Sequence, residues 1–294
     1  MGPHPHGAPA GGALRAAARR CGQGRQVVIP PAVVTAIVFV YGLVLGSFLN
    51  VVIHRLPLEI SLWKPRSRCP ACGALVRWFD NLPLISFLWL RGRCRSCRTP
   101  ISWRYPVVEL ATGTLLALVH HRLGLTLPAA EAGVLVLLLV PLAFIDLDHH
   151  LLPDVLTLPG IVLGLAGAAA EGWLLQPSGH RLVPLVDATI GTVLGAAIPA
   201  LVIVAYRWLR GKEGMGWGDV KLLAMLGAFL GWRGMLMSLM LGVVSGAIVG
   251  LALIAGGRGK ADTELPFGTF LCGAGVVVLL WAHQLARLVW GSGS

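Results

Sequence analysis

The chain has 294 residues, of which 56% are hydrophobic and only 13% are charged. A soluble domain carries roughly a quarter charged residues, so this composition excludes an ordinary soluble enzyme. The net charge of +11 would suit a nucleic-acid partner, but the basic residues gather in a few connecting segments instead of along one helix face. Because basic loops are typical of the cytoplasmic side of a membrane protein, we expect contacts with membrane lipid and no nucleic-acid partner.

The N-terminal segment differs in composition from the rest of the chain. Residues 1–30 are rich in Gly, Ala, Pro, His and Arg and lack the apolar core of a secretory signal. We expect a disordered tail there. A first transmembrane helix is predicted directly after it, at 31–52, and we expect this helix to be retained.

Apolar runs long enough to cross a hydrocarbon core of about 30 Å recur along the chain. They predict an all-α polytopic membrane protein with about eight transmembrane helices. The sixth run is short and contains glycine, which favours a segment that begins within the membrane plane or is half-buried in protein. The predicted spans are 32–52, 106–122, 129–147, 154–173, 184–208, 219–232, 234–256 and 267–290.

The spans divide the chain into a tail at 1–30, a first helix at 31–52, an insert at 53–105 and a transmembrane domain at 106–290. The insert carries ten Lys or Arg residues against two acids. Positive loops stay on the cytoplasmic side. The charge pattern therefore predicts a periplasmic N terminus and a cytoplasmic insert, although the four arginines of the tail favour the opposite orientation.

The insert contains two C-x-x-C pairs separated by 21 residues. Two such pairs supply four thiolates with the spacing of a structural zinc site, and Gly73 allows the chain to turn tightly after the first pair. Disulfides are the competing interpretation, which a reducing cytoplasm disfavours. Cys272 has no such partner and is expected in the core or facing lipid. The predicted zinc ligands are Cys69, Cys72, Cys94 and Cys97.

Acidic residues are rare in this chain, and those at the ends of membrane spans are costly enough to indicate function. Asp146, Asp148 and Asp154 lie between the third and fourth spans, and Asp219 opens the sixth. The order of the spans brings both groups to the cytoplasmic face, where two carboxylates could share a proton and activate water. A solvated loop charge at Asp148 and a helix cap at Asp154 are the alternatives to catalysis.

Several neighbours of these acids also suggest roles. Gly214, Gly216 and Gly218 precede Asp219 and suit a backbone that bends beside an extended peptide, or simply a flexible loop. Lys221 reaches the membrane interface or screens the acid pair. Glu109 pairs with Arg104 or contacts a ligand.

Seven segments together resemble the type IV prepilin peptidases, which are bifunctional leader peptidases and N-methyltransferases. Their order, spacing and position relative to the predicted spans all agree with that family. The segments are 46–57 (GSFLNVVIHRLP), the two cysteine pairs, 104–110 (RYPVVEL), 145–159 (IDLDHHLLPDVLTLP), 212–227 (KEGMGWGDVKLLAMLG) and 266–268 (PFG).

The resemblance implies a G-x-G-D aspartyl peptidase of the bacterial inner membrane, with Asp146 and Asp219 as the catalytic pair. It implies that prepilins and pseudopilins are cut after a short basic leader, and that the new N terminus is methylated from S-adenosylmethionine. The four-cysteine insert belongs to the bifunctional members of the family. Residues 1–30 have no recognised counterpart, and the insert before Cys69 is short. No G-x-G-x-x-G loop is present, so the residues that bind the methyl donor stay unknown.

Overall fold

A computed structural model describes residues 2, 30–64, 66–177, 180–211, 216–257 and 265–290. The chain divides into two units, Met1–Val34 and Thr35–Ser294, and the account below concerns the second. Within the described residues the regular elements are helices, accompanied by two isolated β-bridges in the insert. The all-α prediction is therefore confirmed. The predicted disordered tail lies almost entirely outside the described residues.

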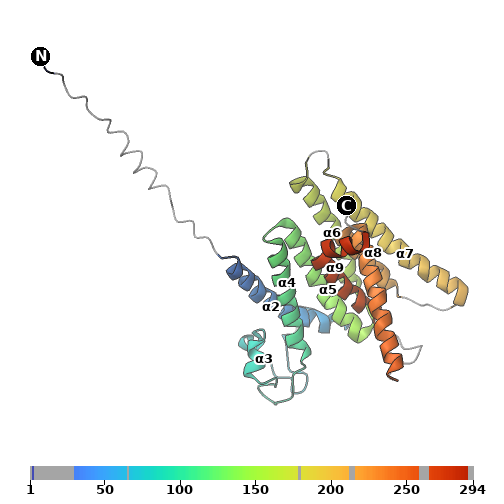
Figure 1. Ribbon diagram of the computed structural model, residues 1–294. Helices are drawn as coiled ribbons and strands as arrows, with labels where there is room; N and C mark the ends of the chain where they lie inside the picture. Colours follow the sequence, from blue (N-terminus) through green and yellow to red (C-terminus); the bar gives the residue numbers. More distant parts are fainter. Residues whose placement is uncertain are drawn as a thin grey trace. The chain divides into compact units, whose positions relative to one another are not determined.

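The helices follow one another with short connections, and the insert separates the first long helix from the others (Figure 1). The insert contains a 3-10 helix, η1, and a short α-helix, α3. The elements are α2 (Pro31–Arg55), η1 (Trp78–Asn81), α3 (Ile85–Trp89), α4 (Arg104–Leu123), α5 (Leu127–His149), α6 (Asp154–Leu175), α7 (Val183–Arg210), α8 (Trp217–Ala255) and α9 (Phe267–Trp290).

Five of these helices, α2, α5, α6, α7 and α8, are long and apolar enough to cross a membrane. The predicted count of eight spans is not confirmed. The sixth and seventh predicted spans form the single helix α8, interrupted at Gly231, where φ is +67° and ψ is 178°. The other two predicted spans correspond to α4, which ends in His120, His121 and Arg122, and to α9, whose apolar stretch covers Phe267–Trp281.

Close packing of α2 on α4 depends on glycine. A Cβ atom at Gly42 would lie 2.7 Å from the Cα of Gly113, and one at Gly46 would lie 2.7 Å from the Cα of Glu109. Any larger side chain would therefore push the helices apart. Small residues four apart are a common means of bringing membrane helices into contact. The side-chain amide of Asn50 adds a hydrogen bond to the carbonyl oxygen of Tyr105, 3.1 Å away.

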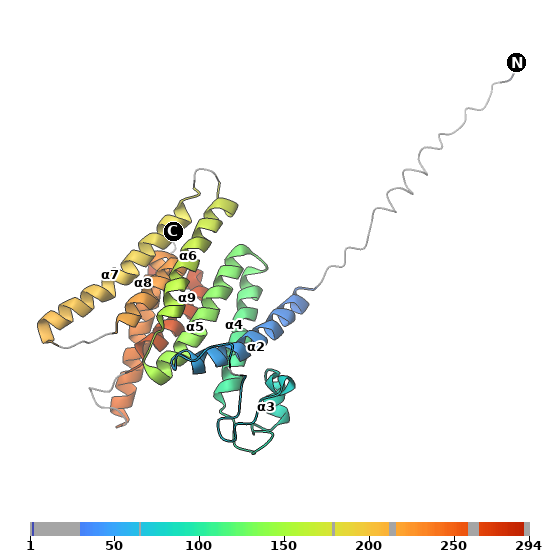
Figure 2. The same cartoon turned by 180° about the vertical axis from the view of Figure 1, so that it is seen from behind.

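The remaining helices pack around α8, which contacts α6, α7 and α9, whereas α5 contacts α4, α6 and α9 (Figures 1 and 2). The apolar core between α5, α8 and α9 is fully enclosed. It includes Leu135, Leu139, Leu142, Leu222, Leu226 and Leu271. On α5 this core ends at Leu142, one turn before Asp146, and on α8 it begins at Leu222, about one turn after Asp219. It therefore holds both acidic helix ends in fixed positions.

Candidate active site and cysteine cluster

Asp146 lies in the last turn of α5, which ends at His150 in a left-handed conformation. Its side chain is 5% exposed. The carboxylate accepts two hydrogen bonds at Oδ2 from Thr269 at the start of α9, 2.6 Å from the backbone nitrogen and 3.1 Å from Oγ1. The Thr269 hydroxyl also lies 3.0 Å from the carbonyl oxygen of Ala143. The start of α9 thus fixes one oxygen of this carboxylate.

Asp219 is the third residue of α8, and Gly216 caps the same helix. The carboxyl group is 8% exposed and receives a hydrogen bond from the backbone of Gly216. It lies close enough to Asp146 for the two acids to interact electrostatically. Cys272 of α9 is buried and interacts electrostatically with both carboxyl groups. Two acids from distant parts of the sequence are therefore brought together among apolar side chains.

Two glycines bring the surrounding chain close to these acids. A Cβ atom at Gly268 would lie 3.0 Å from the carboxyl carbon of Asp146 and 2.9 Å from a methyl carbon of Leu152. A Cβ atom at Gly218 would lie 2.9 Å from the Cβ of Leu152. The absence of side chains at Gly218 and Gly268 lets Leu152 pack against both segments. Gly218 lies within the first turn of α8, so the alternative of a flexible loop does not hold for this residue, and its expected role beside an extended peptide stays a prediction.

Arg104 at the start of α4 forms an ion pair with Asp148. Its guanidinium group also donates to the carbonyl oxygen of Phe144, 3.3 Å away, and lies 5.6 Å from the centre of that ring. Asp148 is exposed, as expected of a solvated charge, but it lies in the last turn of α5 and not in a loop, and it is paired. The pair ties the end of α5 to the point where the insert rejoins the helices.

Lys221, two residues after Asp219, forms an ion pair with Asp154, with Nζ 2.6 Å from Oδ1. Asp154 is the first residue of α6, and Pro153 before it occupies the cap position, so Asp154 does not cap the helix. The carboxylate instead ties the start of α6 to the start of α8. Each acid of the central pair thus has an ion pair two residues further along its own chain segment.

Glu109 does not pair with Arg104, which contradicts one of the two sequence interpretations. Its buried carboxylate accepts a hydrogen bond from the backbone nitrogen of Leu84, 2.9 Å from Oε2, and another from the Ser47 hydroxyl. Leu84 precedes α3 and has a positive φ of 57°. Glu109 therefore joins α2, α4 and the insert, and no ligand is needed to explain its burial.

The four predicted zinc ligands converge in the insert: the Sγ atoms of Cys69, Cys72, Cys94 and Cys97 all lie within 4.8 Å of one another. The thiols are free, so the disulfide alternative is not found. The Sγ atoms of Cys69 and Cys97 are 3.8 Å apart, which is the separation that a tetrahedral ion with bonds of about 2.3 Å to sulfur requires. Hydrogen bonds with the side chain and backbone of Thr99 lower the pKa of Cys97 to about 6, which favours a thiolate.

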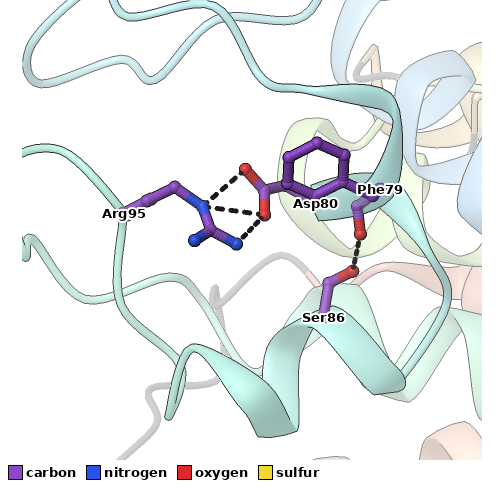
Figure 3. A network of polar contacts seen from close by, with 4 residues as sticks. All are labelled: Phe79, Asp80, Ser86 and Arg95. Carbon is purple, nitrogen blue, oxygen red and sulfur yellow. Dashed lines mark hydrogen bonds and ion pairs between the residues drawn. The ribbon is translucent and has the colours of Figure 1, made fainter.

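Two further contacts support the cysteine cluster from one side. The guanidinium group of Arg95 pairs with the carboxylate of Asp80 at 2.5 Å, and lies 5.4 Å from the centre of the Phe79 ring (Figure 3). The Ser86 hydroxyl donates to the carbonyl oxygen of Phe79 at 2.8 Å (Figure 3). These contacts connect the second cysteine pair to η1 and α3.

Sequence reasoning missed Thr269 and Leu152 as neighbours of the acid pair. Thr269 directly follows the segment 266–268, so the end of that segment was the available signal. Leu152 lies within the segment 145–159, but its role could not be predicted from that segment because it depends on contacts with Gly218 and Gly268. The predicted glycine loop before Gly216 lies at 212–215, outside the described residues.

Most of the chain matches two models of known protein families. Residues 40–123 match the bacterial peptidase A24 N-terminal domain, and residues 133–251 match the type IV leader peptidase family. A prepilin leader peptidase/N-methyltransferase of Aeromonas hydrophila is 41% identical over 276 residues, covering 86% of this chain and 92% of the relative. No solved structure shows a significant match.

Two other relatives carry the same name. The protein of Myxococcus xanthus strain DK1622 is 48% identical over 231 residues, which cover 77% of this chain and 65% of the relative. The protein of Pseudomonas aeruginosa is 40% identical over 269 residues, covering 84% of this chain and 90% of the relative.

Proposed function

The chain belongs to the type IV leader peptidase family, and we propose that it is a membrane aspartyl endopeptidase that removes the leader from prepilins and pseudopilins. The assignment of the catalytic acids rests on one observation. Asp146 and Asp219 come from separate helices, are both buried, and interact with each other at the helix ends next to the insert.

In the proposed reaction the two carboxyl groups share the proton transfers of peptide hydrolysis. One carboxylate takes a proton from the attacking water while the other, protonated, group donates to the carbonyl oxygen or to the leaving amine. Positioned acid–base groups of this kind contribute about 10² to 10⁴-fold to the rate. Thr269 holds one oxygen of Asp146 in place and so leaves the other oxygen for water. No covalent intermediate is required.

We further propose that the protein lies in the bacterial inner membrane with a periplasmic N terminus and the acid pair at the cytoplasmic face. The ion pairs Arg104–Asp148 and Lys221–Asp154 support a common face, because the first joins the start of α4 to the end of α5 and the second joins the start of α6 to the start of α8. The excess of basic residues in the insert supports the cytoplasmic side. A prepilin helix in the bilayer would then present its leader junction at this face.

The four cysteines of the insert are proposed to bind one structural Zn²⁺ ion. The distance of 3.8 Å between two of the sulfur atoms fits that ion, as does the convergence of all four sulfur atoms within 4.8 Å. When bound, zinc would supply the cross-link that holds the two C-x-x-C pairs together. Methylation of the new N terminus from S-adenosylmethionine is proposed as the second activity, on the strength of the relatives' names. We assign no residue to the methyl donor.

The assignment of the acids is tested with Asp146→Asn and Asp219→Asn, which keep the side-chain shape and remove the acid–base function. Purified protein is incubated with a prepilin substrate, with and without S-adenosylmethionine, and the products are identified by mass. We expect the leader product to disappear in both variants.

Glu171→Gln is the matched control, because this carboxylate lies 17 residues after Asp154 on α6, roughly 25 Å along the helix. It should cleave like the unaltered chain. Cleavage by Asp219→Asn at more than a few per cent of the control rate would contradict the proposed acid pair. Cleavage without methylation in the unaltered chain would contradict only the second activity.

A further inference from the structure

The insert contains an open groove beside α3 that none of the proposed chemistry uses. Its volume is about 420 Å³. Its lining combines apolar side chains with two arginines. The lining residues are Phe87, Leu88, Arg91, Gly92, Arg93, Pro100, Ile101 and Trp103.

The groove is held beside the first turns of α4. Glu109 of α4 accepts the hydrogen bond from the Leu84 backbone directly before α3, and the rings of Phe87 and Trp103 lie 4.9 Å apart. Glu109 is five residues beyond the start of α4, which corresponds to roughly 7 Å along that helix. Both views show α3 next to this end of α4, on the side away from α6 to α9 (Figures 1 and 2). The groove therefore lies level with the start of a helix that returns the chain to the bundle.

The surface around the groove is apolar and exposed. Leu88 is 71% exposed, Trp89 80% and Trp103 73%. Val107 and Leu110 on α4 are also exposed. Large exposed apolar side chains gathered in one part of a protein indicate a binding face, and tryptophan is enriched where protein meets the membrane interface.

The charge of the groove points to an anion. Neither the Arg91 nor the Arg93 side chain forms an ion pair or hydrogen bond with the part of the chain that the structure describes, whereas Arg95 and Arg104 each have an acidic partner. No acidic residue lines the groove. A sulfonium such as that of a methyl donor would be repelled by two unpaired guanidinium groups. A phosphate attached to an acyl chain would pair with the two arginines and cover the apolar side chains.

We propose that this groove binds the headgroup of an anionic phospholipid, with Arg91 and Arg93 contacting the phosphate and Leu88 and Trp89 lying at the boundary between headgroups and acyl chains. Juxtamembrane basic residues attract anionic lipid in this way. The bound lipid would fix the insert against the membrane surface, on the same face as the acid pair. The site is independent of the peptidase reaction.

Lipid binding is measured by native mass spectrometry on the detergent-purified full chain, titrated with phosphatidylglycerol or with phosphatidylcholine of the same acyl chains. We expect Arg91→Gln/Arg93→Gln to weaken phosphatidylglycerol binding by about 30-fold and to leave phosphatidylcholine binding unchanged. Arg91→Lys/Arg93→Lys should retain most of the binding. Arg66→Gln/Arg68→Gln, two exposed arginines of the insert outside the groove, should change it less than about threefold.

Equal losses in the groove variant and the Arg66/Arg68 control would overturn the proposal, because they would indicate a general charge effect. Displacement of the lipid by millimolar inorganic phosphate would overturn it in favour of a free-anion site. Loss of S-adenosylmethionine binding in Arg91→Gln/Arg93→Gln, with lipid binding unchanged, would assign the groove to the methyl donor instead. Zinc content serves as the folding check for every variant.

The contact of α3 with the membrane is tested separately with a photocrosslinking amino acid in lipid nanodiscs. At Leu88 we expect adducts with phospholipid, as at Leu110, an exposed apolar residue of α4. Leu75 is the matched control, because it is an apolar residue of the insert, 54% exposed, outside the groove. Lipid adducts at Leu110 without any at Leu88 would overturn the membrane contact, as would adducts at Leu88 formed with a second copy of the chain.

Discussion

The helix ends around the acid pair and the cysteine insert are held together by different means. Asp146 and Asp219 lie at the edge of an apolar core in which residues such as Leu142 and Leu222 are fully buried. In residues 56–103, Ser86 is the one buried residue among those that the structure describes. Small domains without a sufficient core usually depend on a metal or on disulfides. We therefore expect the insert to depend on a metal ion held by its four cysteines, whereas the acid pair depends on helix packing.

The largest expected effect comes from replacing the two acids, which should abolish cleavage and leave the insert unchanged. Asp146→Asn and Asp219→Asn should each lower leader cleavage by at least about 10³-fold, and the double variant should lose little more, because the two groups act as a unit. Zinc content should stay unchanged in all three. Cleavage rates of the double variant that fall by the product of the single losses would show that the two acids act independently.

The converse experiment removes the metal ligands. Cys69→Ser/Cys72→Ser should reduce zinc from about one ion per chain to nearly none, and should make the insert sensitive to limited proteolysis while the helices stay protected. Metal analysis and mass mapping of the fragments measure this. Cys272→Ala is the control for metal content, since Cys272 lies in the helix core. A protected insert without zinc would show that it folds on its other contacts.

A smaller effect is expected from the hydroxyl group that contacts Asp146. Thr269→Ala keeps the backbone donor and removes the Oγ1 contact of 3.1 Å, so cleavage should fall roughly 10-fold in kcat. Thr269→Ser restores the hydroxyl and should restore the rate. An equal loss in both variants would indicate that the methyl group packs the site and that the hydroxyl is unimportant. Substrate affinity, measured as KM, should change little in either.

The smallest effects concern the ion pairs of the two regions. Lys221–Asp154 is partly exposed, so Asp154→Asn should change cleavage by no more than about threefold. Asp80→Asn, which removes the partner of Arg95 in the insert, should leave cleavage unchanged and slightly increase proteolysis of the insert. Effects above about 10-fold for Asp154→Asn would mean that this pair positions Asp219.

Much of the site could be predicted because its signals are local. The spacing of two C-x-x-C pairs was enough to predict that the four thiols meet, and acids at the ends of apolar spans are rare enough to stand out. The ion pairs were harder to predict. Asp148 and Asp154 each looked like a local feature, a loop charge and a helix cap, but their partners Arg104 and Lys221 come from other helices.

Membrane composition, the family resemblance and the four clustered thiols followed from the sequence alone, since each depends on residue types and on spacings along the chain. Only the tertiary structure decided that α8 runs through Gly231 as one interrupted helix, that Thr269 holds Asp146, and that Glu109 fastens the insert to α4. The physical reason is that these features depend on contacts between segments far apart in sequence. Spacing along one segment carries no information about which distant backbone groups will meet it.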